Sequence, residues 1–149
     1  MRTSMRIVFA AAAVALLLVP TAATPQSVSE DFDKSRIITL QGRVEGFVSA
    51  GQNAPHFYVM LNIKNERWLI EGKSRAALIE SGWTFGEGGL LPTGETVTVT
   101  VYRLKPTVDV KQALSGLPPR LQENVETDHV AHGIEITLSS GRKMAFGDR

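Results

Sequence analysis

Three histidines, His56, His129 and His132, are the residues of this chain best suited to acid–base or metal chemistry. The spacing of His129 and His132 looks like a metal-binding pair. On a strand, however, residues i and i+3 point to opposite faces, so these two could bind one ion only across a bulge or at a strand end. His132 also alternates in register with Ile134 and Ile136, which predicts a histidine on their strand face, at its rim. Both remain weak candidates for metal ligands.

His56 is the third weak metal candidate and the histidine we would test first for function. It follows Pro55 at the start of a predicted strand, beside a loop over residues 49–55. Proline restricts the backbone around it, so the imidazole is presented from a stiff point. Such a position suits either a hydrogen bond to a loop carbonyl or contact with a ligand or an ion. The sequence favours the first role and leaves the second open.

Trp68, Glu71 and Trp83 form a second group of candidate ligand-binding residues. Trp68 shares a predicted strand face with Ile70, whereas Glu71 lies on the opposite face at the end of the same strand. Buried tryptophans are ordinarily core anchors, and this interpretation is favoured. The alternative is an aromatic platform for a sugar or another flat ligand, with Glu71 as its polar partner. One carboxylate without a visible partner does not make a catalytic pair.

Several common catalytic and cofactor sites have no counterpart in this sequence. There is no cysteine, which excludes disulfides, thiol nucleophiles, thiolate metal sites and a lipid-anchored N-terminal cysteine. The glycine-rich run at residues 86–89 precedes a predicted strand and has no following Lys-Ser/Thr, so it is not a phosphate loop. The Gly-x-Ser-x-Gly elbow of many hydrolases is also missing. We therefore expect no cofactor and favour a non-catalytic role over an enzyme.

Most of the elements that would position these side chains are short strands. Alternating apolar residues predict a strand from Arg36, in which Gly42 and Gly46 mark a bulge or a bend. The same alternation predicts strands over residues 57–63, 67–71, 96–102, 130–138 and 143–146. A short helix precedes the fourth strand, with Ser74 as its N-cap and Gly82 at its end.

This set of elements is typical of a mostly β protein. Five or six short antiparallel strands with one short helix predict a small, partly closed barrel of the OB-like (oligonucleotide/oligosaccharide-binding) type, and a β-sandwich is the alternative. Residues 105–129 form an excursion too long for an ordinary hairpin loop. A capping box at Asp109 and the pair Pro118-Pro119 predict one or two helical turns there. The excursion is expected to close one end of the barrel; a lid or a partner-binding loop is the alternative.

The N-terminus is typical of an exported protein. Arg2 and Arg6 precede an apolar run over residues 7–19, and the small residues Thr21 and Ala23 fit a cleavage site. The apolar run is shorter than the roughly 20 residues that a spanning helix needs. We therefore predict a signal peptide at residues 1–23, a flexible lead-in at 24–35 and one domain at 36–149. The mature protein is expected in the periplasm or outside the cell.

Cleavage after Ala23 would remove two arginines and leave 14 basic against 15 acidic residues, a net charge of −1. Affinity for nucleic acid comes largely from clustered Lys and Arg, so this balance points away from nucleic acid. No membrane insertion is expected once the signal peptide is removed. The partner is left open as a small molecule, a glycan or a protein.

The predicted domain carries an ordered set of residues whose spacing is familiar. It consists of Thr39-Leu40-x-Gly42-x-Val44, Pro55-His56, Trp68-x-Ile70-Glu71, Leu78, Gly82-Trp83 and Val97-x-Val99. This set resembles a family of small secreted bacterial proteins of unknown function, over residues 32–102 and more loosely up to residue 142. The family's Trp-x-Asn-Pro-His motif is only partly kept at residues 53–56, and its N-terminal His-His pair is missing. The resemblance implies an exported β domain and brings no established activity.

Three functions from different classes remain. The favoured one is an exported, non-catalytic binding or accessory module. The alternatives are a weak metal-binding protein that uses His56 and a small hydrolase or lyase that acts from a cleft at a barrel end. Convergence of His56 with a second titratable side chain in one pocket would favour the enzyme.

Overall fold

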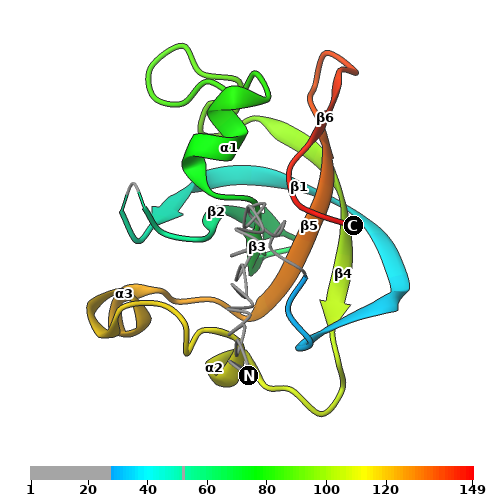
Figure 1. Ribbon diagram of the computed structural model, residues 1–149. Coiled ribbons are helices and arrows are strands. Elements are labelled where there is room, and N and C mark those ends of the chain that lie inside the picture. The colour runs from blue at the N-terminus through cyan, green and yellow to red at the C-terminus, as the bar shows by residue number, and fades with distance from the viewer. Residues whose placement is uncertain (1–27, 52) are drawn as a thin grey trace, which may run out of the picture.

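The computed structural model of the protein describes residues 28–51 and 53–149 (Figure 1). Six strands form one sheet in the order β3-β2-β1-β4-β5-β6, and an additional parallel pairing of β3 with β5 closes most of it into a ring. The strands are β1 (Phe32–Ser49), β2 (Phe57–Ile63), β3 (Glu66–Glu71), β4 (Thr96–Leu104), β5 (His129–Thr137) and β6 (Lys143–Ala145). The predicted mostly β, partly closed barrel is confirmed, although the ring is not a regular barrel. The β-sandwich alternative is wrong.

The long, bent strand β1 holds the ring together. It pairs with β4 along its first part and with β2 along its second, and the register shifts between Val44 and Gly46, where a bulge or bend was predicted. At Gly42 a Cβ atom would lie only 2.6 Å from a side-chain carbon of Ile63, so glycine allows the two strands to approach. The strand begins at Phe32 rather than at Arg36 because Phe32 is buried and pairs with β4.

The interior of the ring is apolar, and we call it the inner cluster. Alternate residues of every strand point into it, as the period-two pattern predicted for β2 and β4. Its buried members are Val44, Phe57, Val59, Leu61, Ile63, Trp68, Ile70, Leu78, Trp83, Leu91, Val97, Val99, Val101, Ala131, Ile136, Leu138, Met144 and Phe146. Burial of this apolar surface is the main force that holds a chain without disulfides together.

A second apolar group, the outer cluster, lies on the opposite face of the strands. Its buried members are Val28, Phe32, Tyr58, Leu69, Tyr102, Leu114, Leu117, Val130 and Ile134. Leu114 and Leu117 come from the 105–129 excursion, which contains the short helices α2 (Val110–Ala113) and α3 (Pro119–Asn124). The predicted helical turns are therefore confirmed. In Figure 1 they lie at the end of the ring opposite to α1.

The prediction that His132, Ile134 and Ile136 share one strand face is wrong. Thr100 of β4 pairs with Glu135 of β5, but the next β4 residue pairs with Gly133, so β5 carries an extra residue at this point. The bulge reverses the alternation: Ile134 belongs to the outer cluster and Ile136 to the inner one. His132 is also not a rim residue, since only 2% of its surface is exposed.

The helix α1 (Arg75–Glu80) forms where the sequence predicted it. The side chain of Ser74 accepts a hydrogen bond from the backbone N–H of Ala77, which caps the helix, and Gly82 follows with a φ of +103°. Trp83 then packs into the inner cluster. No helix within the described ranges is long and apolar enough to cross a membrane. The predicted signal peptide at residues 1–23 and the first part of the lead-in lie outside those ranges.

Candidate functional site

Glu71 and His132 form a buried polar pair at the seam that closes the ring. Glu71 is the last residue of β3, and the parallel register of β3 with β5 places it opposite His132. The Nδ1 atom of His132 lies 3.0 Å from Oε1 of Glu71. Only 6% of Glu71 and 2% of His132 are exposed. Water therefore screens this contact far less than it would a contact at the surface.

Both ring nitrogens of His132 face oxygen acceptors. Nε2 lies 2.8 Å from the backbone carbonyl oxygen of Asp148. A carbonyl oxygen only accepts, so Nε2 carries a proton. Nδ1 and the carboxyl group of Glu71 then share a second proton, either as an imidazolium and a carboxylate or as a neutral imidazole and a carboxylic acid. In both arrangements the pair as a whole is neutral, which lowers the cost of its burial.

His56 approaches the same carboxyl group from the loop before β2. Its Nδ1 atom lies 3.0 Å from the carbonyl oxygen of Gly72 and 3.6 Å from Oε1 of Glu71. Because the carbonyl only accepts, Nδ1 is protonated and donates to Gly72. A hydrogen bond to a loop carbonyl, one of the two predicted roles of His56, is thus present. A quarter of the side chain remains exposed.

Tyr58 completes the polar group, because the β2–β3 hairpin pairs it with Glu71. Burial, and secondarily the charge of Glu71, raise the pKa of Tyr58 far above its ordinary value of about 10. The hydroxyl therefore stays protonated and can donate as well as accept. Above about pH 10 the unfolded chain would lose this proton before the folded one does, so the stability of the fold decreases as the pH rises further.

A cavity of about 310 Å³ lies where these side chains meet the 105–129 excursion. The cavity is lined by residues before β1, in the loop between β1 and β2, in β2 and β3, and in the excursion. They are Ser29, Asp31, Ala50, Ala54, Pro55, His56, Tyr58, Glu71, Ala113, Ser115, Gly116 and Leu117. Its volume falls within the range of small-molecule sites in proteins. The structure thus brings two sequence-predicted candidates, His56 and Glu71, together in one cavity.

The two tryptophans do not line this cavity. Trp68 is 7% exposed and stacks on the imidazole of His129, with ring centroids 4.3 Å apart. Trp83 is 1% exposed, and its indole N–H donates to the backbone carbonyl oxygen of Ala145 at 2.8 Å. Both rings belong to the inner cluster, in agreement with the favoured interpretation of core anchors.

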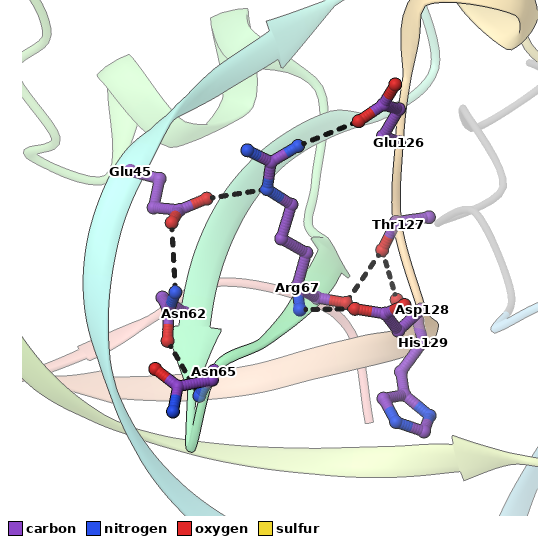
Figure 2. Close-up of polar contacts among 8 residues, drawn as sticks. All are labelled: Glu45, Asn62, Asn65, Arg67, Glu126, Thr127, Asp128 and His129. Carbon is purple, nitrogen blue, oxygen red and sulfur yellow. Dashed lines mark hydrogen bonds and ion pairs between the residues drawn. The ribbon is translucent and has the colours of Figure 1, made fainter.

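A separate polar cluster, shown in Figure 2, ties the end of the excursion to β3. Arg67 is its centre: Nε lies 3.3 Å from a carboxylate oxygen of Glu45, and Nη1 lies 3.3 Å from one of Glu126. The backbone N–H of Arg67 donates to the carboxylate of Asp128 at 2.8 Å. These contacts hold the residue before His129 against β3 and help to start the parallel pairing.

The three histidines do not converge on one point. The contact of His129 with the carboxylate of Glu66, at 2.6 Å, is partly exposed, whereas the contact of His132 with Glu71 is buried. Within residues 28–51 and 53–149, no group of three or more histidine, aspartate or glutamate side chains is arranged to hold a metal ion.

Sequence reasoning missed Tyr58, the pairing of His132 with Glu71 and the contribution of residues 113–117. A signal for Tyr58 was available. The hairpin turns at Lys64-Asn65, one residue tighter than the predicted turn over residues 64–66, and counting back from this two-residue turn places Tyr58 opposite Glu71. His132 had no such signal, because a parallel pairing between distant segments leaves no local pattern.

Comparison with known families agrees with the resemblance to a family of unknown function. Residues 13–111 match the model of a family of unknown function, DUF6152. The chain belongs to this family. The match includes His56, Tyr58 and Glu71 but ends before His132, so it covers one wall of the cavity and only the start of the excursion. The family carries no described activity. No curated protein and no solved structure matches the chain.

Proposed function

We propose that the protein is an exported, non-catalytic binding module and that the cavity beside His56 is its ligand site. The observation that carries the proposal is the convergence of His56, Tyr58 and Glu71 in a cavity of about 310 Å³. Most ligand sites combine such a volume with a few converging polar groups on a rigid scaffold. Here β2 and β3 supply the scaffold, and the hydrogen bond from His56 to Gly72 restrains the imidazole.

A screen of small polar molecules tests this proposal. We expect at least one member of a library of sugars, polyols, amino acids and amines to shift the amide NMR resonances of Gly72, Gly116 and Leu117. The shifts should disappear in His56→Ala and persist in His129→Ala, since His129 does not line the cavity. Denaturant midpoints of both variants control for the lost hydrogen bond to Gly72. If no compound shifts these resonances, or if His56→Ala binds normally, the proposed site is wrong.

The convergence of His56 with Glu71 in one pocket is also the feature expected of the catalytic alternative, a small hydrolase or lyase, with His56 as general base. The contact between Nδ1 of His56 and Glu71 would orient the imidazole and stabilise its protonated form during proton transfer. Hydrolysis of a panel of 4-nitrophenyl esters and glycosides measures this directly. Turnover that is lost in His56→Ala but kept in His129→Ala would make the protein an enzyme, and its absence leaves the binding module favoured.

A further inference from the structure

The cavity beside His56 presents an unpaired acceptor from a nearly buried side chain. Oε1 of Glu71 contacts both histidines, whereas Oε2 forms no hydrogen bond within residues 28–51 and 53–149. No fully buried side-chain oxygen or nitrogen of those residues lacks a partner. Oε2 is therefore not fully buried, and Glu71 is among the residues that line the cavity. It is an acceptor in both arrangements of the proton shared with His132, because that proton lies at Oε1.

His56 offers a second acceptor to the same cavity. Its Nδ1 proton is donated to Gly72, and Nε2 forms no hydrogen bond in the part of the chain that the structure describes. In a neutral imidazole with a protonated Nδ1, Nε2 carries the lone pair and accepts. These two side-chain atoms thus both require hydrogen-bond donors, and the hydroxyl of Tyr58 in the same cavity can accept as well as donate.

The charged side chains that line the cavity are also acidic rather than basic. The pair of Glu71 and His132 is neutral as a whole, and Asp31 adds a carboxylate that no ion pair within the described residues neutralises. No lysine or arginine is among the described residues that line the cavity. A carboxylate or phosphate ligand would therefore find hydroxyl donors but no positively charged lysine or arginine side chain, and it would meet the negative charge of Asp31.

We infer that the cavity takes a small primary ammonium compound, whose N–H groups donate to Oε2 of Glu71 and Nε2 of His56. The inference rests on the proposed function, because it names the ligand class of that site. An ammonium group has three donors and no acceptor, which complements these two atoms, and its charge is balanced by Asp31. The volume of about 310 Å³ suits a small molecule.

Three compounds of matched length test the inference on the mature protein: putrescine, 1,4-butanediol and succinate. They carry two ammonium groups, two hydroxyl groups and two carboxylates on the same four-carbon scaffold. In calorimetric titrations with NMR mapping, putrescine should bind at the cavity at least about tenfold more tightly than either analogue, as expected for charge-assisted hydrogen bonds. Its affinity should also fall as the salt concentration rises.

Three variants locate the effect. Glu71→Gln replaces one carboxyl oxygen with an amide NH₂, which donates instead of accepting, while it keeps the shape, and it should weaken putrescine binding about tenfold. Because this variant also disturbs the buried pair, Asp31→Asn provides a second measurement at a more exposed side chain. Glu30→Gln is its matched control, since Glu30 is exposed and does not line the cavity. Asp31→Asn should weaken binding severalfold, and Glu30→Gln should leave it unchanged.

The outcomes separate this inference from the proposed function. If the library screen finds a cavity ligand but putrescine binds no better than butanediol or succinate, the ligand class is wrong and the binding module stands. If neither the library nor putrescine perturbs the cavity, both are wrong. Binding of Zn²⁺ to chelator-treated protein without binding of putrescine would assign the cavity to a metal and overturn the inference.

Discussion

The carboxyl group of Glu71 and the imidazole of His132 are both buried, and each supplies the hydrogen-bond partner that the other requires. An unpaired charge in a protein interior costs several kcal/mol, and a hydrogen-bonded partner of opposite charge offsets much of that cost. The contact of His129 with Glu66 is chemically similar but half exposed, so water weakens it. Two histidines three positions apart on one strand thus differ in environment far more than their sequence suggests.

Replacing each histidine with alanine measures this difference. His132→Ala leaves the carboxyl group of Glu71 without its buried partner and should lower the free energy of unfolding by about 3–5 kcal/mol. His129→Ala removes only an exposed pair and a ring stacked on Trp68, and should cost about 1 kcal/mol or less. Urea denaturation of both variants gives the comparison. Equal losses would mean that the pair of Glu71 and His132 is not buried as described.

The C-terminal segment after β6 packs closely against the ends of β3 and β5, and small residues make room for it. Phe146 is fully buried, and its backbone carbonyl oxygen accepts a hydrogen bond from the N–H of Lys73. At Gly72, a Cβ atom would lie 2.6 Å from the ring of Phe146. The close approach of this segment to β3 therefore depends on the absence of a side chain at residue 72.

An alanine at position 72 should force the Phe146 ring to move. We expect Gly72→Ala to lower the free energy of unfolding by about 1–3 kcal/mol, as overpacking in cores does. Gly46→Ala is the matched control, because a Cβ atom there would meet nothing within 4 Å, and it should change stability by less than about 1 kcal/mol. Thermal denaturation of both variants measures the difference in stability. A similar effect of both substitutions would show that the contact with Phe146 is not responsible.

Local signals were sufficient to predict most elements from the sequence. Alternation identified β2 and β4, and the residues Ser74 and Asp109 each cap the helix predicted after them. The bulge in β5 could not be predicted, because the apolar alternation continues through Ile134 to Leu138 in the sequence. Only the partner strand shows where the extra residue lies, since it is the pairing with Thr100 and Val101 that shifts.

Only the part of the candidate site that comes from β2, β3 and the loop before β2 could be predicted from the sequence. His56 and Glu71 could be selected from their positions at strand ends, but the partner of Glu71 lies 61 positions further along the chain. The parallel pairing of β3 with β5 brings the two together, and no local pattern encodes a pairing of that kind. The same reason explains why the wall formed by residues 113–117 was not foreseen.

The predicted export concerns the whole protein and has its own test. The protein produced in an exporting bacterial host should begin at or near Thr24 and be recovered in the periplasmic fraction. The reason is the order of Arg2 and Arg6, the apolar run and the small residues before Thr24. Intact-mass measurement of the purified chain checks the cleavage. A full-length mass in the membrane fraction would contradict both the cleavage and the location.

The parallel seam also determines when the cavity can exist as the chain folds. The β2–β3 hairpin depends on contacts between neighbours in sequence, whereas the seam needs β5 and the C-terminal residues to reach β3 across a long stretch of chain. Closing such a long loop costs entropy before its contacts form, which slows folding. A chain that ended before His129 would contain His56, Tyr58 and Glu71 but would lack His132, the buried partner of the Glu71 carboxyl group. Occupancy of the cavity by a ligand would therefore report that β5 has docked on β3.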